Sequence, residues 1–168
     1  MEVAKEGAEG GRDTKYPANI EELGEYLNAR PKAQDPFLEK YDFSGKRILV
    51  AEDIRLNREI AAEILKQTGA QVEFAIDGQE CLNMVSAAPA GYYDLILMDI
   101  LMPNMDGVEA TRRIRRLEDH RKALVPIIAL SANVYEKDQK EALEAGMNGF
   151  AEKPIFVEKL FEAMRECL

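Results

Sequence analysis

Polar residues suited to metal and phosphate chemistry follow several short apolar runs of the sequence. Glu52 and Asp53 follow the first run, Asp99 and Ser131 follow two later runs, and Lys153 follows the last. If these runs are parallel strands of one sheet, their carboxyl ends meet at one edge, because crossovers between parallel strands are right-handed. We therefore expect three carboxylates, one hydroxyl and one ammonium group to converge there.

Three adjacent carboxylates repel one another unless a cation lies among them. Mg²⁺ fits because it prefers oxygen ligands, whereas the lack of usable histidine and cysteine ligands argues against Zn²⁺. An acidic pair such as Glu52-Asp53 is by itself more often a solvated loop, but its occurrence together with Asp99 and Lys153 favours a site. A carboxylate between Mg²⁺ and a lysine can attack phosphorus, which makes Asp99 the candidate nucleophile.

The elements that must position these residues repeat five times from Lys46 onward. Short apolar runs alternate with longer amphipathic stretches, which is typical of βαβ units around a parallel sheet. We therefore expect an α/β fold in which a five-stranded, parallel, doubly wound sheet is flanked by five helices. The predicted strands are Arg47–Glu52, Gln71–Ile76, Asp94–Met98, Pro126–Leu130 and Gly149–Ala151.

Residues 1–44 differ in texture from the rest of the chain. They combine glycines and prolines with charged residues, which predicts a linker-like N-terminal extension ahead of a domain at 45–168. The spacing of three apolar residues predicts one short helix at 20–29. We expect the extension to supply no residue to the site, so a chain beginning near Tyr41 should fold, bind Mg²⁺ and accept a phosphoryl group at nearly the full rate.

Composition and charge exclude several classes of protein. The 22 basic and 31 acidic residues give a formal net charge of −9, which disfavours binding to nucleic acid or anionic lipid. The longest uncharged stretches fall short of the ~20 apolar residues of a membrane span, so we expect no membrane contact by this chain. Cys81 and Cys167 lack metal-ligand spacing and predict reduced thiols, which is typical of a cytoplasmic protein.

The motifs resemble those of the receiver domains of two-component response regulators, and most of all the receivers of hybrid sensor histidine kinases. The resemblance covers about Lys46 to Leu168. It implies a flavodoxin-like sheet with the strand order 2-1-3-4-5. The motifs that carry it are Glu52-Asp53, Leu95–Gly107, Ala129–Ala132 and Glu152–Pro154, and those that favour the hybrid-kinase subtype are Asn57–Glu59 and Glu144–Met147.

The resemblance implies roles for the acidic residues. Asp99 would be the phosphoacceptor, and Asp53 would bind Mg²⁺ directly. Glu52 would bind the ion through water, and Leu101 would contribute only its backbone carbonyl. Leu101 also departs from the family pattern because it is bulky and flanks the approach of attacking water, which leaves the lifetime of the phosphoryl group open.

The resemblance also implies a switch. Ser131 would bond a phosphoryl oxygen, although it is equally a candidate N-cap for the following segment. Lys153 would pair with the phosphoryl group, and the Lys153–Pro154 bond would be cis. Phe150 falls where the family has a switch aromatic, often tyrosine, but by residue type it is more often a core residue.

The sequence thus predicts a phosphoacceptor domain that is not itself an enzyme and that switches protein contacts. Its partner would be a histidine kinase or a histidine phosphotransfer protein, and a homodimer through the last helices is left open. The alternative is a pseudo-receiver that binds partners without phosphorylation. A haloacid-dehalogenase-type phosphohydrolase is less favoured, because it needs a second aspartate two residues after the nucleophile, where Leu101 stands.

Overall fold

A computed structural model describes residues 25, 29, 39–132 and 135–168 of the chain. Five parallel strands form one sheet in the order β2-β1-β3-β4-β5, which confirms the doubly wound α/β fold and its strand order. Each strand lies within one residue of its predicted bounds at either end. The strands are β1 (Arg47–Ala51), β2 (Gln71–Ala75), β3 (Leu95–Asp99), β4 (Ile127–Ser131) and β5 (Gly149–Glu152).

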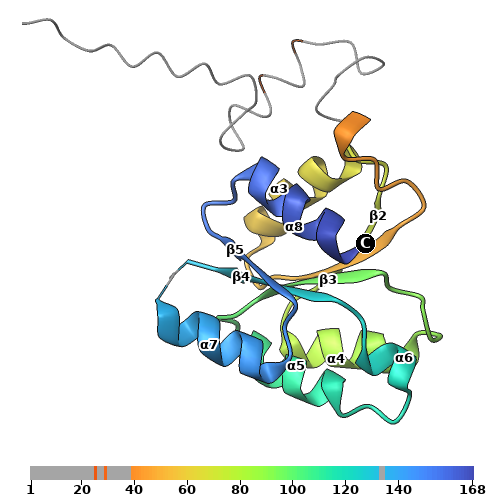
Figure 1. Cartoon of the computed structure of the whole chain (residues 1–168), viewed down its shortest axis with the longest axis vertical. Coiled ribbons are helices and arrows are strands. Elements are labelled where there is room, and N and C mark those ends of the chain that lie inside the picture. The colour runs from red at the N-terminus through yellow and green to blue at the C-terminus, as the bar shows by residue number, and fades with distance from the viewer. Residues whose placement is uncertain (1–24, 26–28, 30–38, 133–134) are drawn as a thin grey trace, which may run out of the picture.

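Helices cover both faces of the sheet. In Figure 1, α3 and α8 lie on one side of the sheet, and α4, α5, α6 and α7 lie on the other. No helix among the described residues is both long and apolar enough to cross a membrane. The helices are α3 (Arg55–Lys66), α4 (Gly78–Ala87), α5 (Gly107–Arg115), α6 (His120–Ala123), α7 (Glu136–Ala145) and α8 (Val157–Cys167).

The short helix α6 adds a sixth helix to the five that were predicted around the sheet. The side chain of Asp119 caps it by accepting hydrogen bonds from the amides of Arg121 and Lys122. A helix of four residues is a single turn, which is too short to produce the apolar periodicity by which the other helices are recognised.

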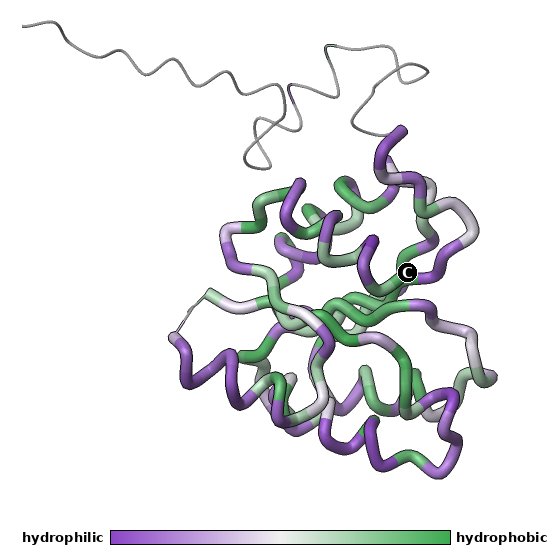
Figure 2. The backbone as a smooth tube through the Cα atoms, in the orientation of Figure 1, coloured by the Kyte–Doolittle hydropathy of each residue, from purple (hydrophilic) through white to green (hydrophobic). Residues whose placement is uncertain are grey.

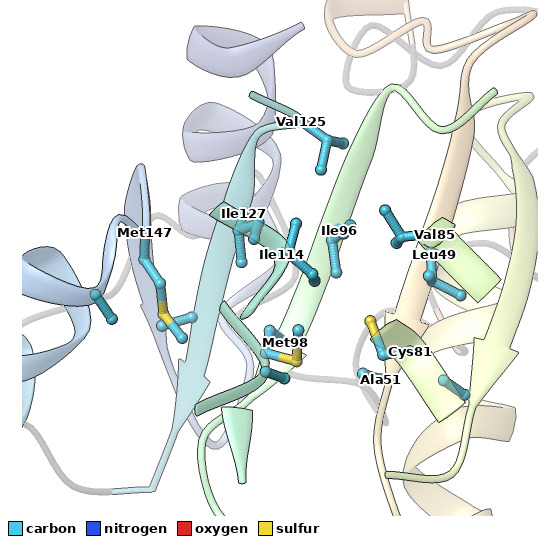
Figure 3. Packing of buried hydrophobic residues seen from close by; sticks show 14 of the residues in the cluster. Leu49, Ala51, Cys81, Val85, Ile96, Met98, Ile114, Val125, Ile127 and Met147 are labelled. Carbon is cyan, nitrogen blue, oxygen red and sulfur yellow. The ribbon is translucent and has the colours of Figure 1, made fainter. Parts of the chain in front are cut away.

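The central strands are buried on both faces, so they read as continuous apolar runs. In β1, Ile48 and Val50 belong to the core beneath α3 and α8, whereas Leu49 and Ala51 belong to the core on the opposite face. Figure 3 shows this second core, where Ile96 of β3 packs among apolar side chains of the neighbouring strands and helices. The outer helix α7 is by contrast largely hydrophilic (Figure 2).

The packed domain begins before the predicted boundary at residue 45. Tyr41 and Phe43 are 0% and 5% exposed and belong to the core beneath α3 and α8. Their rings lie 5.3 and 5.9 Å from the ring of Phe161 in α8, both in edge-to-face geometry. The amide of Phe43 also donates to the carbonyl of Thr68, after α3 (2.8 Å). The end of the predicted linker is therefore part of the folded domain.

The helix predicted at 20–29 falls mostly outside the described residues. Of its positions, only Glu25 and Ala29 are described. The amide of Ala29 donates to the carbonyl of Glu25 (3.0 Å), which is the hydrogen bond of a single helical turn.

Candidate functional site

The sequence-predicted residues meet at the carboxyl edge of the sheet. Glu52 and Asp53 follow β1 directly, and Asp99 is the last residue of β3. One carboxylate oxygen from each of these three residues lies within 4.8 Å of the others. Parallel pairing of β1 with β3 produces this arrangement, because it sets Ala51 opposite Met98 and so brings the two strand ends level. The acidic cluster is defined by these three residues.

Lys153 supplies the cation of the acidic cluster. Its Nζ donates to Oε2 of Glu52 (2.5 Å) and to Oδ2 of Asp99 (2.7 Å). The Lys153–Pro154 bond is cis, as predicted. The amide of Lys153 also donates to the carbonyl of Ser131 (2.7 Å), which ties the end of β5 to the end of β4.

Burial and Lys153 set the ionisation of the acidic cluster. Burial raises the pKa of Asp99 above its ordinary value, and the charge of Glu52 acts in the same direction, while Lys153 offsets them only in part. Burial also opposes ionisation of Glu52, but hydrogen bonds from Lys153 and from the Ile54 amide outweigh it and hold the pKa of Glu52 below its ordinary value. The same two carboxylates outweigh burial at Lys153 and raise its pKa, so the ammonium stays charged.

The donor set of the acidic cluster fits a hard divalent cation. Three carboxylates against one ammonium leave a formal charge of −2 at the site. The side-chain carboxylate of Asp53 has no hydrogen-bond or ion-pair partner among the described residues, and the residue is only partly buried. An oxygen-only set with a free carboxylate suits Mg²⁺, which keeps several of its waters and binds to one or two carboxylates.

The loop after β3 holds Asp99 in place from its backbone. The amide of Leu101 donates to Oδ1 of Asp99 (3.2 Å), while the Leu101 side chain projects outward and the residue is 68% exposed. The loop folds back so tightly that a Cβ on Gly107 would lie 2.1 Å from the carbonyl oxygen of Asp99. Only glycine fits there, so the glycine of the LILMDILMPNMDG motif has a steric reason.

Ser131 and Phe150 occupy neighbouring strands beside the acidic cluster. Ser131 is the last residue of β4 and is 5% exposed. Phe150 lies in β5 opposite Ala129, is partly buried, and packs against the core on the α4 and α5 face. This placement is compatible with core packing and with a switch aromatic, so both interpretations of Phe150 stay open.

Two residues of α3 contact the acidic cluster, although sequence reasoning used them only as part of the family resemblance. Nδ2 of Asn57 donates to Oε1 of Glu52 (3.2 Å). Nη1 of Arg58 donates to the backbone carbonyls of Glu52 (2.7 Å) and Asp53 (2.8 Å). Their position in the first two turns after the acidic pair could have indicated that they lie near it. Sequence spacing alone, however, does not show in which direction a long side chain points.

Comparison with known proteins places this geometry in one family. The response regulator receiver domain family matches residues 48–165. A probable histidine kinase 4 from Oryza sativa subsp. japonica is 36% identical over 142 residues, which cover 74% of this chain and 14% of that protein. A hybrid signal transduction histidine kinase L from Dictyostelium discoideum is 36% identical over 76% of this chain and 7% of its own length. The chain thus spans a small part of these relatives.

Two similar solved structures are receiver domains of histidine kinases. The receiver domain of the sensor histidine kinase PA1611 from Pseudomonas aeruginosa, which has a magnesium ion coordinated in its active-site cleft, is 36% identical. The match covers 73% of this chain and 97% of that one, with a TM-score of 0.65. The receiver domain of the histidine kinase CKI1 from Arabidopsis thaliana, complexed with Mg²⁺ and BeF3-, is 34% identical over 77% and 93% of the two chains, with a TM-score of 0.67. The chain therefore belongs to the response regulator receiver domain family.

Proposed function

We propose that this chain accepts a phosphoryl group on Asp99 from the phosphohistidine of a histidine kinase or a histidine phosphotransfer protein. The observation that carries the proposal is the contact of Lys153 with Asp99 (2.7 Å) inside a cluster of three carboxylates. An oxygen of Asp99 attacks phosphorus, the P–N bond breaks, and the imidazole leaves with the bonding electron pair. The chain is in this view a signalling domain of a phosphorelay rather than an enzyme with its own substrate.

Asp53, Asp99 and the backbone carbonyl of Leu101 would hold Mg²⁺ directly, and Glu52 would hold it through water. When bound, Mg²⁺ supplies positive charge to the transferring group. Burial of Asp99 excludes water from the nucleophile, and the amide of Leu101 orients its carboxylate. Lys153, already charged and 2.7 Å from Asp99, neutralises charge on the phosphoryl oxygens.

Phosphorylation would then bias the domain between two packings. The new group adds negative charge and oxygen acceptors beside Lys153 and Ser131. Ser131 is joined to β5 through the backbone hydrogen bond to Lys153, so a movement of either residue reaches Phe150 and the faces of α7 and α8. The population of one packing rises because it binds the phosphoryl oxygens better. The output is a change of protein contacts. One such contact could be a homodimer through the last helices.

The proposal is tested by phosphorylating the chain with a small phosphodonor in the presence of Mg²⁺ and measuring its intact mass. We expect a gain of about 80 Da, the mass of one phosphoryl group, that disappears when Mg²⁺ is chelated. Asp99→Asn should abolish it. Asp106→Asn is the matched control: Asp106 caps α5 by accepting from the amide of Glu109, and asparagine caps equally well.

An adduct of the same mass in Asp99→Asn would show that another residue accepts the group. A wild-type chain that gains no mass from a small phosphodonor or from a phosphorylated histidine phosphotransfer protein would favour the alternative of a pseudo-receiver that binds without phosphorylation. We further propose a cytoplasmic location, where histidine kinases phosphorylate their receivers, in keeping with the two free cysteines.

A further inference from the structure

The guanidinium of Arg58 is bound to the backbone of the acidic pair. Arg58 lies in the first turns of α3, and its Nη1 contacts the carbonyl oxygens of Glu52 (2.7 Å) and Asp53 (2.8 Å). One donor nitrogen thus holds two consecutive peptide groups. Since both are charge-assisted hydrogen bonds, they are stronger than ordinary backbone hydrogen bonds.

Few other contacts hold this loop. The N-cap of α3 is Ile54, which has no side chain that can bond the free amides of the first turn, and the first turn has no acidic residue. The amide of Ile54 donates instead to Oε1 of Glu52 (3.1 Å), which also accepts from Asn57. Besides the hydrogen bond of the Glu52 amide to the carbonyl of Ala75 (3.0 Å), the orientation of the loop therefore depends on the Glu52 side chain and on Arg58.

The two residues of the acidic pair are held differently. The carboxylate of Glu52 is 3% exposed and is engaged by Lys153, Asn57 and the Ile54 amide. The carboxylate of Asp53 has none of these contacts, so within the described part of the chain only the backbone fixes its direction. The orientation of a peptide group sets the direction of the adjacent Cα–Cβ bond, and Arg58 binds the carbonyls on both sides of Asp53.

We infer that Arg58 is a positioning residue that directs the carboxylate of Asp53 toward Asp99 and so prepares the acidic cluster for a divalent cation. The inference rests on the proposed function, in which Asp53 binds Mg²⁺. Arg58 acts through its two charge-assisted hydrogen bonds and not through a direct interaction of its charge with the ion. A second cation near a Mg²⁺ site repels the ion, so the charge of Arg58 opposes Mg²⁺ binding while its hydrogen bonds favour it.

Charge and hydrogen bonding are separable because α3 offers a matched control. Arg55 begins the same helix, has an 85% exposed side chain, and pairs with Glu59 without contacting the loop. The variants Arg58→Gln and Arg55→Gln remove the same charge from the same end of α3. Isothermal titration with Mg²⁺ in 1 M KCl, where the Debye length is about 3 Å, further suppresses the contribution of surface charge.

We expect Arg58→Gln to bind Mg²⁺ about ten-fold more weakly than Arg55→Gln, at the lower end of the loss caused by removing a hydrogen-bond partner of a metal ligand. Arg58→Lys, which keeps the charge and can still donate to both carbonyls, should recover part of the affinity. A purely structural role would lower the stability of the variants at position 58 without this order of affinities. Urea unfolding in EDTA supplies the stability of each variant, and Arg58→Lys keeps the test decisive where Arg58→Gln unfolds.

If Arg58→Gln and Arg55→Gln bind Mg²⁺ with equal affinity, the role of Arg58 is overturned. The proposed function stays intact in that case as long as the wild-type chain binds Mg²⁺ and gains the phosphoryl mass. A wild-type chain that binds no Mg²⁺ overturns both. The inference is supported only if Arg58→Gln loses Mg²⁺ affinity relative to Arg55→Gln and Arg58→Lys recovers part of it.

Discussion

The carboxyl and amino edges of the sheet differ in how their charged side chains are paired. At the carboxyl edge, three carboxylates share one ammonium group, and burial raises the pKa of Asp99. Toward the amino edge, the tyrosines that precede β3 reach a carboxylate in the middle of β2: Glu73 accepts hydrogen bonds from the hydroxyls of Tyr92 (2.7 Å) and Tyr93 (2.8 Å). The guanidinium of Arg47 lies 3.9 Å from the centre of the Tyr92 ring. The carboxyl edge concentrates negative charge, whereas the polar side chains toward the amino edge are paired with one another.

Arg115 shows how the amino edge holds a partly buried cation with oxygen acceptors other than carboxylates. Its guanidinium donates to backbone carbonyls at the ends of α6 and α7, where the helix dipoles place partial negative charge. Burial lowers the pKa of Arg115, but arginine stays charged at neutral pH. The acceptors are the carbonyls of Gly146, Ala123 and Val125 and the side-chain oxygen of Asn148.

We therefore expect the acidic cluster at the carboxyl edge and the stabilising polar contacts at the amino edge to act independently. Changes at the amino edge should lower the free energy of unfolding and leave Mg²⁺ binding unchanged in the folded protein. Changes to Asp53 or Asp99 at the carboxyl edge should remove most of the Mg²⁺ binding or abolish phosphorylation at little cost, or even with a gain, in stability.

The largest expected effect is on stability, at the amino edge. A chain beginning at Gly45 lacks Tyr41 and Phe43, so we expect its free energy of unfolding to fall by about 4 kcal/mol, the cost of removing a large buried aromatic side chain. A chain beginning at Glu39 keeps both rings and the ion pair of Lys40 with Glu162, and should match the full chain. Urea unfolding followed by circular dichroism measures both. Equal stability of the two truncated chains would contradict the packing described here.

The next effect concerns Arg115. Arg115→Gln leaves several partly buried carbonyls without a donor, so we expect a loss of about 3 kcal/mol in the free energy of unfolding. Arg113→Gln is the control, because Arg113 makes only an exposed ion pair with Glu109 and its loss should be within experimental error. The Mg²⁺ affinity of both variants should equal that of wild type. A weakened affinity in Arg115→Gln would show that the edges are coupled.

Mg²⁺ should stabilise the wild-type chain by about 2.7 kcal/mol at a concentration of 100 times its Kd. Asp53→Ala should remove most of this stabilisation, whereas Glu52→Ala should remove far less, because Asp53 is the proposed direct ligand and Glu52 is held by Lys153. Urea unfolding with Mg²⁺ and with EDTA gives the difference for each variant. Similar losses in the two variants would mean that the roles within the acidic pair are wrongly assigned.

The smallest effect has the opposite sign. Asp99→Asn should raise the free energy of unfolding in EDTA slightly, because burial raises the pKa of Asp99 and so disfavours its charge in the folded state. The gain is full above the folded pKa and vanishes below the ordinary value of 3.8, where Asp99 is protonated in both states. The control is Asp94→Asn at the other end of β3: it loses the ion pair of Asp94 with Lys46 (3.8 Å), so it should not gain stability. A pH-independent gain would contradict this cause.

The three central strands and the residues at their ends were predictable because burial on both faces produces continuous apolar runs. The crossover rule predicts that Asp99 and Lys153 share one edge of the sheet, and the strand order that sets their separation was implied by the family resemblance. Tyr41 and Phe43 were missed because two aromatic residues among charges and prolines form no pattern. Arg58 was missed for another reason: its side chain reaches back toward its own helix N-terminus, and sequence spacing does not encode that direction.

The packing of Tyr41 and Phe43 on α8 has a consequence for the architecture of longer polypeptides. The segment before β1 and the last helix lie on the same side of the domain (Figure 1), joined by the Tyr41 and Phe161 rings and by the hydrogen bond of Tyr41 with Glu162 (3.3 Å). The domain can therefore be inserted into a surface loop of a host protein, or circularly permuted with a short connecting peptide, with little displacement of the flanking chain. A pull on the preceding chain would act mechanically on α8 rather than on the acidic cluster.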